Sequence, residues 1–220
     1  MSDKKLVDLS HTITDGLITY KGLPAPIMCD FLSREASKKH YAEGTSFHIG
    51  KIEMVANTGT YIDSPFHRFA EGQDISELPL EKLADLDAVK VKVMVPRGRA
   101  VGPEVFGARW LGGKAVLIQT GWSKHWGTDQ YFEGHSYLTE DAAAHLVGQG
   151  VTLVGIDSYN IDDTDDGRRP VHTMLLGAGI PIVEHMCNLD LLPFDELRFS
   201  AVPVKVKGMG TFPVRAYARW

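Results

Sequence analysis

The sequence predicts an α/β domain, and three neighbouring stretches support this prediction. Residues 115–122 (Ala-Val-Leu-Ile-Gln-Thr-Gly-Trp) and 151–157 (Val-Thr-Leu-Val-Gly-Ile-Asp) are short, mostly apolar runs that are typical of buried strands. Between them, residues 139–150 predict a helix, because Thr139 is a favourable N-cap, two acidic residues follow it and Gly150 suits the C-terminal end. A helix followed at once by an apolar strand predicts a crossover unit.

The other elements follow from local composition. Enrichment in β-branched and aromatic residues predicts strands in five further stretches: residues 6–11, 46–56, 86–95, 180–184 and 199–206. Short helical segments are expected within residues 74–83, 103–107 and 172–177. The polar residues 33–45 predict a loop that crosses the surface.

The overall composition limits the classes of function. The chain has 220 residues, of which 44% are hydrophobic and 23% charged, as expected for a globular protein with one large domain or a compact pair. The net charge of −5 argues against a nucleic-acid surface. No apolar run approaches the roughly 18 residues that a membrane span needs. The two cysteines, Cys29 and Cys187, lack CxxC spacing, which predicts reduced thiols and a cytoplasmic location.

The most informative stretch is residues 57–67, Asn-Thr-Gly-Thr-Tyr-Ile-Asp-Ser-Pro-Phe-His. Gly59 permits a bend or a close approach of a ligand, and Pro65 restrains the turn that follows. Asp63 and His67 therefore come at a bend from strand to loop. A carboxylate and an imidazole four residues apart are typical of a metal site or an acid–base site.

A second polar stretch follows the strand predicted at residues 151–157. It contains five aspartates: Asp157, Asp162, Asp163, Asp165 and Asp166. Their spacing lacks the glutamate at the twelfth position of an EF-hand loop, which argues against that kind of calcium site. We expect most of these carboxylates to lie in a solvated loop.

Residues 57–67 resemble the signature of the cyclase family, which includes bacterial kynurenine formamidases and isatin hydrolase. The family motif is His-x-Gly-Thr-His-x-Asp-x-Pro-x-His, and five residues match it in register: Gly59, Thr60, Asp63, Pro65 and His67. The resemblance extends along nearly the whole chain, through the opening Asp-Leu-Ser-His, the Thr-Gly-Trp at residues 120–122 and the Asn-Leu-Asp at residues 188–190.

The resemblance implies an architecture for residues 1–220. We expect a single cyclase-family domain with a central mixed β-sheet or barrel-like core and flanking helices, of a swivelling β/β/α type. Such proteins are homodimers or homotetramers whose subunits help to close each other's pockets, and their substrates are small molecules.

The resemblance also implies a metal site, with one departure. Members with the full motif hold two metal ions, but Asn57 and Tyr61 stand where the family has its two histidines. The ligands of the second ion match Asp63, His172 and Glu184, the last two being twelve residues apart as in the family. We therefore expect one divalent ion, with zinc as the first choice and manganese or iron as alternatives.

Three other positions are expected to contact the substrate or shape its pocket. Tyr20 matches a family aromatic residue that touches the substrate, although a half-buried loop aromatic is an equal alternative. Asn57 and Tyr61 face the space of the missing ion, where they either donate hydrogen bonds to an oxyanion or fill the space by packing. His67 matches the acid–base histidine of the family.

Three functions are compatible with these residues. The first is a metal-dependent hydrolase, resembling an arylformamidase, that cleaves an amide, formamide, cyclic amide or ester bond with His67 as general acid and base. The second is a lyase or isomerase that uses the same metal and base. The third is a non-catalytic protein that binds a small ligand, and the loss of two histidines is the argument for it.

Overall fold

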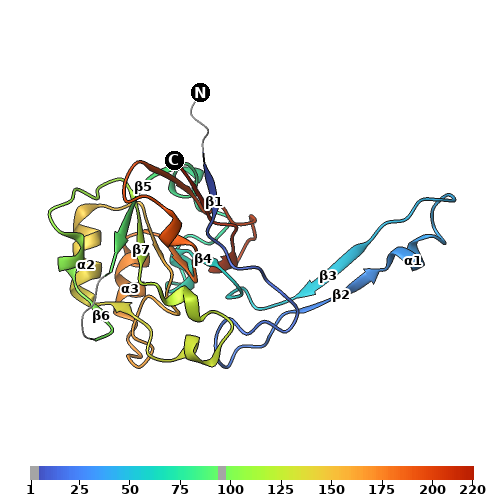
Figure 1. Cartoon of the computed structure of the whole chain (residues 1–220), viewed down its shortest axis with the longest axis horizontal. Helices are drawn as coiled ribbons and strands as arrows, with labels where there is room; N and C mark the ends of the chain where they lie inside the picture. Colours follow the sequence, from blue (N-terminus) through green and yellow to red (C-terminus); the bar gives the residue numbers. More distant parts are fainter. Residues whose placement is uncertain (1–4, 94–97) are drawn as a thin grey trace.

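The computed structural model of the chain describes residues 5–93 and 98–220. Within these residues nine strands form one curled mixed sheet, in the order β1-β13-β11-β5-β7-β9-β10-β4-β12 (Figure 1). In chain order the strands are β1 Leu6–Asp8, β4 Tyr61–Asp63, β5 Leu86–Lys92, β7 Ala115–Gln119, β9 Leu153–Ile156, β10 Ile182–Glu184, β11 Leu197–Ser200, β12 Thr211–Pro213 and β13 Tyr217–Arg219. This sheet confirms the predicted α/β class. Residues 1–4 of the predicted domain and residues 94–95 of a predicted strand lie outside the described residues.

The centre of the sheet is parallel. Strands β5, β7, β9 and β10 run in one direction, while the strands outside them pair in antiparallel fashion. The predicted crossover is confirmed, because helix α2 (Glu140–Gln149) connects the parallel neighbours β7 and β9. The Thr139 side chain accepts a hydrogen bond from the backbone N–H of Ala142, and Gly150 ends the helix with a φ of 68°.

Both faces of the central strands are buried, so their sequences are apolar without clear alternation. On one face Val116 and Ile118 of β7 pack in a cluster with residues of α2 and of helix α3 (Pro170–Gly177). On the other face Ala115 and Leu117 pack in a second cluster with residues of β11 and β13. Each fully buried aliphatic side chain of this kind contributes about 1.5–3 kcal/mol to folding.

The strand order at one edge brings distant parts of the sequence together. Strand β4 lies between β10 and β12, with Tyr61 opposite Glu184 and Asp63 opposite Thr211. The 3-10 helix η1 (Pro65–His67) follows β4 directly and confirms the predicted bend. Gly59 has a φ of 69°, and a Cβ there would lie 2.7 Å from the Ile13 side chain. The close approach that Gly59 permits is therefore to Ile13 of the same chain.

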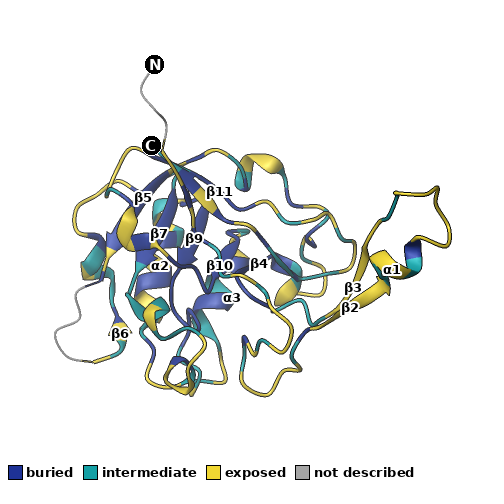
Figure 2. Cartoon of the chain, turned by 45° about the vertical axis from the view of Figure 1, so that its right-hand side comes forward, coloured by how far each residue is buried: buried dark blue, intermediate teal, exposed yellow. Residues whose placement is uncertain are grey.

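Residues 27–53 project away from the body of the molecule and are called the arm below (Figure 1). The arm is a two-stranded hairpin of β2 (Ile27–Leu32) and β3 (Ile49–Glu53), with the short helix α1 (Arg34–Ser37) in the connection. The expectation of a loop at residues 33–45 is thus wrong at its start, because Ser33 caps a helical turn. Figure 2 shows that the strands of the arm are exposed, in contrast to the buried central sheet.

The remaining differences are small. The strand predicted at 199–206 starts two residues earlier and ends at Ser200. Two short strands, β6 (Ala100–Val101) and β8 (Tyr137–Leu138), pair outside the main sheet. Five further 3-10 helices cover loops of the described chain: η2 Leu80–Lys82, η3 Pro103–Phe106, η4 Trp122–His125, η5 Asp129–Phe132 and η6 Leu189–Leu191. In the part of the chain that the structure describes, no helix has the length and apolarity of a membrane span.

Candidate active site

A cavity of about 280 Å³ opens beside the edge formed by β4 and β10. Six of the seven predicted site residues line it: Tyr20, Asn57, Tyr61, His67, His172 and Glu184. The seventh, Asp63, is fully buried beside His172. The structure thus brings together residues that the sequence separates by more than 160 positions. Leu23, Arg68, Asn160 and Arg169 complete the lining.

Asp63 is the last residue of β4 and its side chain is completely buried. Its Oδ1 atom accepts a hydrogen bond of 2.6 Å from the Thr211 hydroxyl on the neighbouring strand β12. Its Oδ2 atom has no hydrogen-bond partner among the described residues and lies 3.6 Å from Nε2 of His172. A buried carboxylate oxygen without a donor is costly, which indicates that a further group satisfies it.

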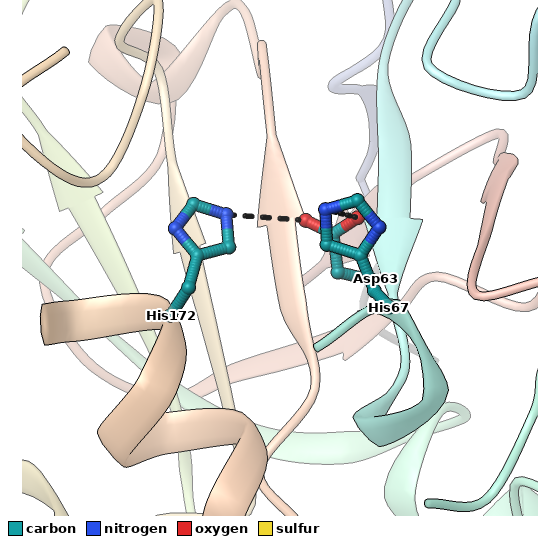
Figure 3. Close-up of side chains that lie close together, drawn as sticks. All are labelled: Asp63, His67 and His172. Carbon is teal, nitrogen blue, oxygen red and sulfur yellow. Dashed lines mark ion pairs between the residues drawn. The ribbon is translucent and has the colours of Figure 1, made fainter. Parts of the chain in front are cut away.

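His172 lies in the first turn of α3 and is held by Asp162. The Asp162 carboxylate lies 2.6 Å from Nδ1 of His172 and also accepts hydrogen bonds from the backbone N–H groups of Val171 and His172. Because a carboxylate accepts, Nδ1 is the protonated nitrogen in the neutral ring, and the lone pair of Nε2 faces Asp63 (Figure 3). The same Nε2 lies 3.8 Å from Oε1 of Glu184. A carboxylate behind a histidine is the usual outer support of a metal ligand.

His67 ends η1 on the open side of this group, and its side chain is 36% exposed. Its Nδ1 lies 2.9 Å from the Thr211 hydroxyl, which donates its only proton to Asp63. The hydroxyl must therefore accept from His67, which makes Nδ1 the protonated nitrogen and leaves Nε2 with a lone pair. That Nε2 lies 3.9 Å from Oδ1 of Asp63 (Figure 3).

Glu184 is the last residue of β10, and both of its carboxylate oxygens have donors. The Tyr61 hydroxyl donates to Oε2 over 2.8 Å, and the backbone N–H of Ile161 donates to Oε1 over 2.7 Å. The three groups whose ligand atoms all lie within 4.8 Å of one another are Asp63, His67 and His172. Glu184 adjoins this group on the side of His172.

Tyr61 belongs to a chain of hydrogen bonds that the sequence did not reveal. Its oxygen lies 3.2 Å from Nε2 of His185, whose Nδ1 lies 2.8 Å from the Tyr131 hydroxyl. Since Tyr61 donates to Glu184, His185 donates to Tyr61 and Tyr131 donates to His185. Burial lowers the pKa of His185 to about 3, so that its ring is neutral. The phenol, at 2% exposure, thus fills the space beside Glu184, while Asn57 is half-buried in the wall.

The charges at the site favour a cation. Burial alone would lower the pKa of His172, but the surrounding carboxylates of Glu184, Asp162 and Asp63 raise it to about 10. Burial raises the pKa of Glu184. The negative charge of Asp63 raises it further, and the positive charge of His172 opposes this rise. Three buried carboxylates around one imidazole carry excess negative charge, which a divalent ion would neutralise. Together with the free Oδ2 of Asp63, this donor set fits a metal ion.

Tyr20 lies at the mouth of the cavity, on the loop before the arm. Its ring lines the cavity and stacks on the buried ring of Tyr159, with centroids 4.7 Å apart, so Tyr159 supports the aromatic wall that Tyr20 forms. Burial raises the pKa of Tyr20, and the positive charge of Arg169 partly offsets this rise. The guanidinium of Arg169 therefore acts on the same part of the cavity.

Sequence reasoning missed Asp162, Thr211 and His185. The expectation of a solvated acidic loop is wrong for Asp157 and Asp162, which are 1% and 0% exposed. Asp157 accepts hydrogen bonds from the backbone N–H groups of Thr120 and Gly121, as Asp162 does from the first turn of α3. The sequence feature that could have identified Asp162 is its position ten residues before His172. No local feature of the sequence identifies Thr211 as a site residue.

Comparison with known proteins places the chain among similar sequences. A family model described as putative cyclase matches residues 7–163. A kynurenine formamidase of Bacillus cereus is 27% identical over 220 residues, covering 100% of this chain and 99% of the relative. The Bacillus anthracis protein of the same name is 26% identical over 221 residues, with the same coverage.

Solved structures share the fold. A potential metal-dependent hydrolase with cyclase activity has a TM-score of 0.79 at 24% identity, covering 98% of both chains. Isatin hydrolase A from Labrenzia aggregata, bound to benzyl benzoate, has a TM-score of 0.83 at 22% identity, covering 98% of this chain and 93% of the other. At these identities the likeness concerns the fold alone.

Proposed function

Because this chain belongs to the putative cyclase family, we propose that it is a metal-dependent hydrolase of an amide or ester bond in a small molecule. The observation that supports this most is Oδ2 of Asp63, which is fully buried, has no hydrogen-bond partner among the described residues and lies 3.6 Å from Nε2 of His172. Relatives named kynurenine formamidase support hydrolysis of a C–N bond. The substrate itself is left open, since Asn57 and Tyr61 depart from the family motif.

One divalent ion would be held by Asp63, His172 and Glu184. The Nε2 atom of His172 faces carboxylate oxygens of both other residues, at 3.6 and 3.8 Å, so the three donors converge. Zinc suits two carboxylates and one imidazole, with manganese and iron as alternatives. Such an ion would lower the pKa of a water molecule and polarise the substrate carbonyl.

His67 is the acid–base residue in this proposal. Its side chain is 36% exposed, whereas those of Asp63 and His172 are buried, and Thr211 keeps the lone pair on its Nε2 atom. Nε2 takes a proton from the attacking water as the water oxygen bonds to the carbonyl carbon. The same nitrogen then gives that proton to the leaving nitrogen or oxygen as the C–N or C–O bond breaks.

Of the remaining predicted residues, Tyr20 and Asn57 bind the substrate in this proposal. The stacked rings of Tyr20 and Tyr159 provide a wall for a planar group. Asn57 offers an amide donor in the cavity wall for the developing oxyanion. Tyr61 donates its proton to Glu184, and its role is to orient that carboxylate and to fill the space beside it.

Metal analysis of His67→Ala and His172→Ala tests these roles. We expect close to one metal ion per chain in the wild type and in His67→Ala, which loses turnover by about 10²–10⁴-fold. His172→Ala should lose the metal. Loss of the metal from His67→Ala would make His67 a ligand, as its place beside Asp63 and His172 would permit.

We also propose that the arm packs on a second copy of the chain in a homodimer or homotetramer. An isolated two-stranded hairpin is marginally stable, and here both strands are exposed. Phe31 and Phe47 are 74% and 51% exposed, which favours burial in an interface. Light scattering should give a multiple of the chain mass, and Phe31→Asp with Phe47→Asp should reduce it. Trp110→Asp, an exposed residue outside the arm, is the control.

The cysteines provide a second readout of this assembly. Cys29 lies on β2 of the arm and is exposed in the single chain, whereas Cys187 is buried in the body. If the arm is covered, alkylation of Cys29 is slow in the wild type and fast in the arm variant. Equal rates in both proteins would argue against the proposed interface. The free thiols also support a reducing, cytoplasmic location, which cell fractionation tests.

A further inference from the structure

Two arginines line the cavity, and neither has a carboxylate partner among the described residues. Arg68 follows His67 directly, and Arg169 precedes His172 by about one helical turn. Among residues 5–93 and 98–220, no carboxylate oxygen lies within 4 Å of either guanidinium, whereas the adjacent Arg168 pairs with Asp166 at 2.8 Å. Unpaired guanidinium groups beside a cavity are typical of sites that bind anions.

The Thr173 hydroxyl links the side chain of Arg68 to the backbone of Arg169. Nε of Arg68 donates a hydrogen bond of 3.0 Å to the Thr173 hydroxyl, which in turn donates to the backbone carbonyl of Arg169 over 2.8 Å. Nη1 of Arg169 donates to the backbone carbonyl of Asp163 over 2.6 Å. These bonds engage one N–H group of each guanidinium, Nε in Arg68 and Nη1 in Arg169, and leave the other N–H groups available to a ligand.

The position of the pair relative to the reacting groups is also defined. Arg68 and Arg169 flank His67 and His172 in sequence and share one cavity with them, and Tyr20 forms the wall. The carboxylates of Glu184, which lines the cavity, and of Asp63, which is buried beside His172, would repel an anion. A substrate with one anionic end therefore has a single favourable orientation, with the anion at the arginines and the carbonyl toward His67.

We propose that the substrate of this enzyme carries a carboxylate, which Arg68 and Arg169 bind in the same cavity that His67 lines. This inference rests on the proposed hydrolase function and adds a substrate class to it. The anion would anchor the molecule, and the aromatic wall would favour a planar ring between the two ends. Neutral amides of the same shape would bind more weakly because the two guanidinium groups would remain without a partner.

A matched pair of compounds tests this. The amide 2-formamidobenzoate and its neutral analogue 2-formamidobenzamide share the ring and the scissile C–N bond and differ in charge. We expect the wild type to prefer the carboxylate by about tenfold or more in kcat/KM, mainly through KM. In Arg68→Gln and Arg169→Gln that ratio should fall toward one. Arg168→Gln, which alters the neighbouring ion-paired arginine, should retain the ratio.

A binding measurement separates this inference from the proposed activity. The product 2-aminobenzoate is fluorescent, and its dissociation constant should rise about tenfold or more in Arg169→Gln and not in Arg168→Gln, with metal content equal in all variants. Arginine-dependent binding without turnover of either amide would retain the anion site and overturn the hydrolase. Turnover with the same charge preference in all variants would retain the hydrolase and overturn the anion site.

Discussion

The Tyr61 hydroxyl donates a 2.8 Å hydrogen bond to Oε2 of Glu184, and the two residues lie opposite each other in the ladder between β4 and β10. The register of two strands therefore determines which group reaches the carboxylate. Where members with the full motif have a histidine, this chain has a phenol that donates a proton and cannot bind a metal as a neutral imidazole does.

We predict that Tyr61→Phe destabilises the protein. The change removes the donor to Oε2 of Glu184 and leaves a buried carboxylate oxygen without a partner, which costs about 1–3 kcal/mol. Urea unfolding of the metal-free protein measures this loss. The control is Tyr217→Phe, the same change at an exposed position on β13, which should have little effect. Equal stability of both variants would show that the hydrogen bond is unimportant.

Restoring both histidines should restore a second metal position. Asn57→His combined with Tyr61→His recreates the family motif on the same backbone, so we expect metal content to rise from about one ion per chain to about two. Elemental analysis after loading with zinc checks this. Asn57→Gln with Tyr61→Phe, which adds no imidazole, should remain near one. A metal content of about one ion per chain in both double variants would contradict our interpretation that Asn57 and Tyr61 remove the second metal position.

Thr211→Val should reduce turnover without removing the metal. Valine matches threonine in shape but lacks the hydroxyl that donates to Asp63 and accepts from Nδ1 of His67. His67 would then no longer be held in one tautomer, and we expect kcat to fall about tenfold or more with a smaller change in KM. Thr128→Val, at an exposed loop hydroxyl, is the control. An unchanged kcat would exclude a positioning role for Thr211.

The Asp85 carboxylate should make stability depend on pH in the acidic range. Hydrogen bonds from Arg198 and Arg219 lower its pKa from 3.8 to about 2 in the folded chain. The unfolded state binds this proton more tightly, so the stabilisation is complete above pH 3.8 and is lost as the pH falls toward about 2. We expect the difference in Tm between wild type and Asp85→Asn to be largest near neutral pH and to shrink below about pH 4. Asn tolerates the left-handed φ of 52° at this position.

The control for the pH series is Asp129→Asn, because Asp129 lies on an exposed 3-10 helix and has no ion pair with the described residues. Its Tm difference from wild type should show no such trend. A difference for Asp85→Asn that stays constant from neutral to acidic pH would mean that the two arginines do not stabilise the folded state through this carboxylate.

Much of the sheet was predictable because its signals are local. Strands β7, β9 and β10 are apolar runs, β5 alternates valine with lysine, and the ends of α2 are marked by Thr139 and Gly150. The arm was not predictable in the same way. Residues 46–56 favour a strand by composition, but nothing in them shows that this strand pairs outside the main sheet, because pairing partners are set by tertiary contacts.

The site residues also divide into those that the sequence identifies and those that only tertiary contacts bring to the site. Asp63 and His67 were identified by spacing within one short segment, and His172 and Glu184 by resemblance to the family. Thr211 could not be found, since it reaches the site through the ladder between β12 and β4. The prediction of a solvated acidic loop was wrong for Asp162 for a physical reason. Its carboxylate is buried because backbone N–H groups at the start of α3 donate hydrogen bonds to it, and the amino-acid composition does not show this.

The pairing of β12 with β4 also has a consequence for biosynthesis. Asp63 leaves the ribosome early, but the strand that carries its hydrogen-bond donor, Thr211, is translated almost 150 residues later. A nascent chain that has reached only Glu184 contains the three proposed metal ligands, but it exposes an unprotected edge at β4 and lacks the Thr211 hydroxyl that contacts Asp63 and His67. The hydrogen bonds that position His67 beside Asp63 therefore form only after nearly all of the 220 residues have been translated.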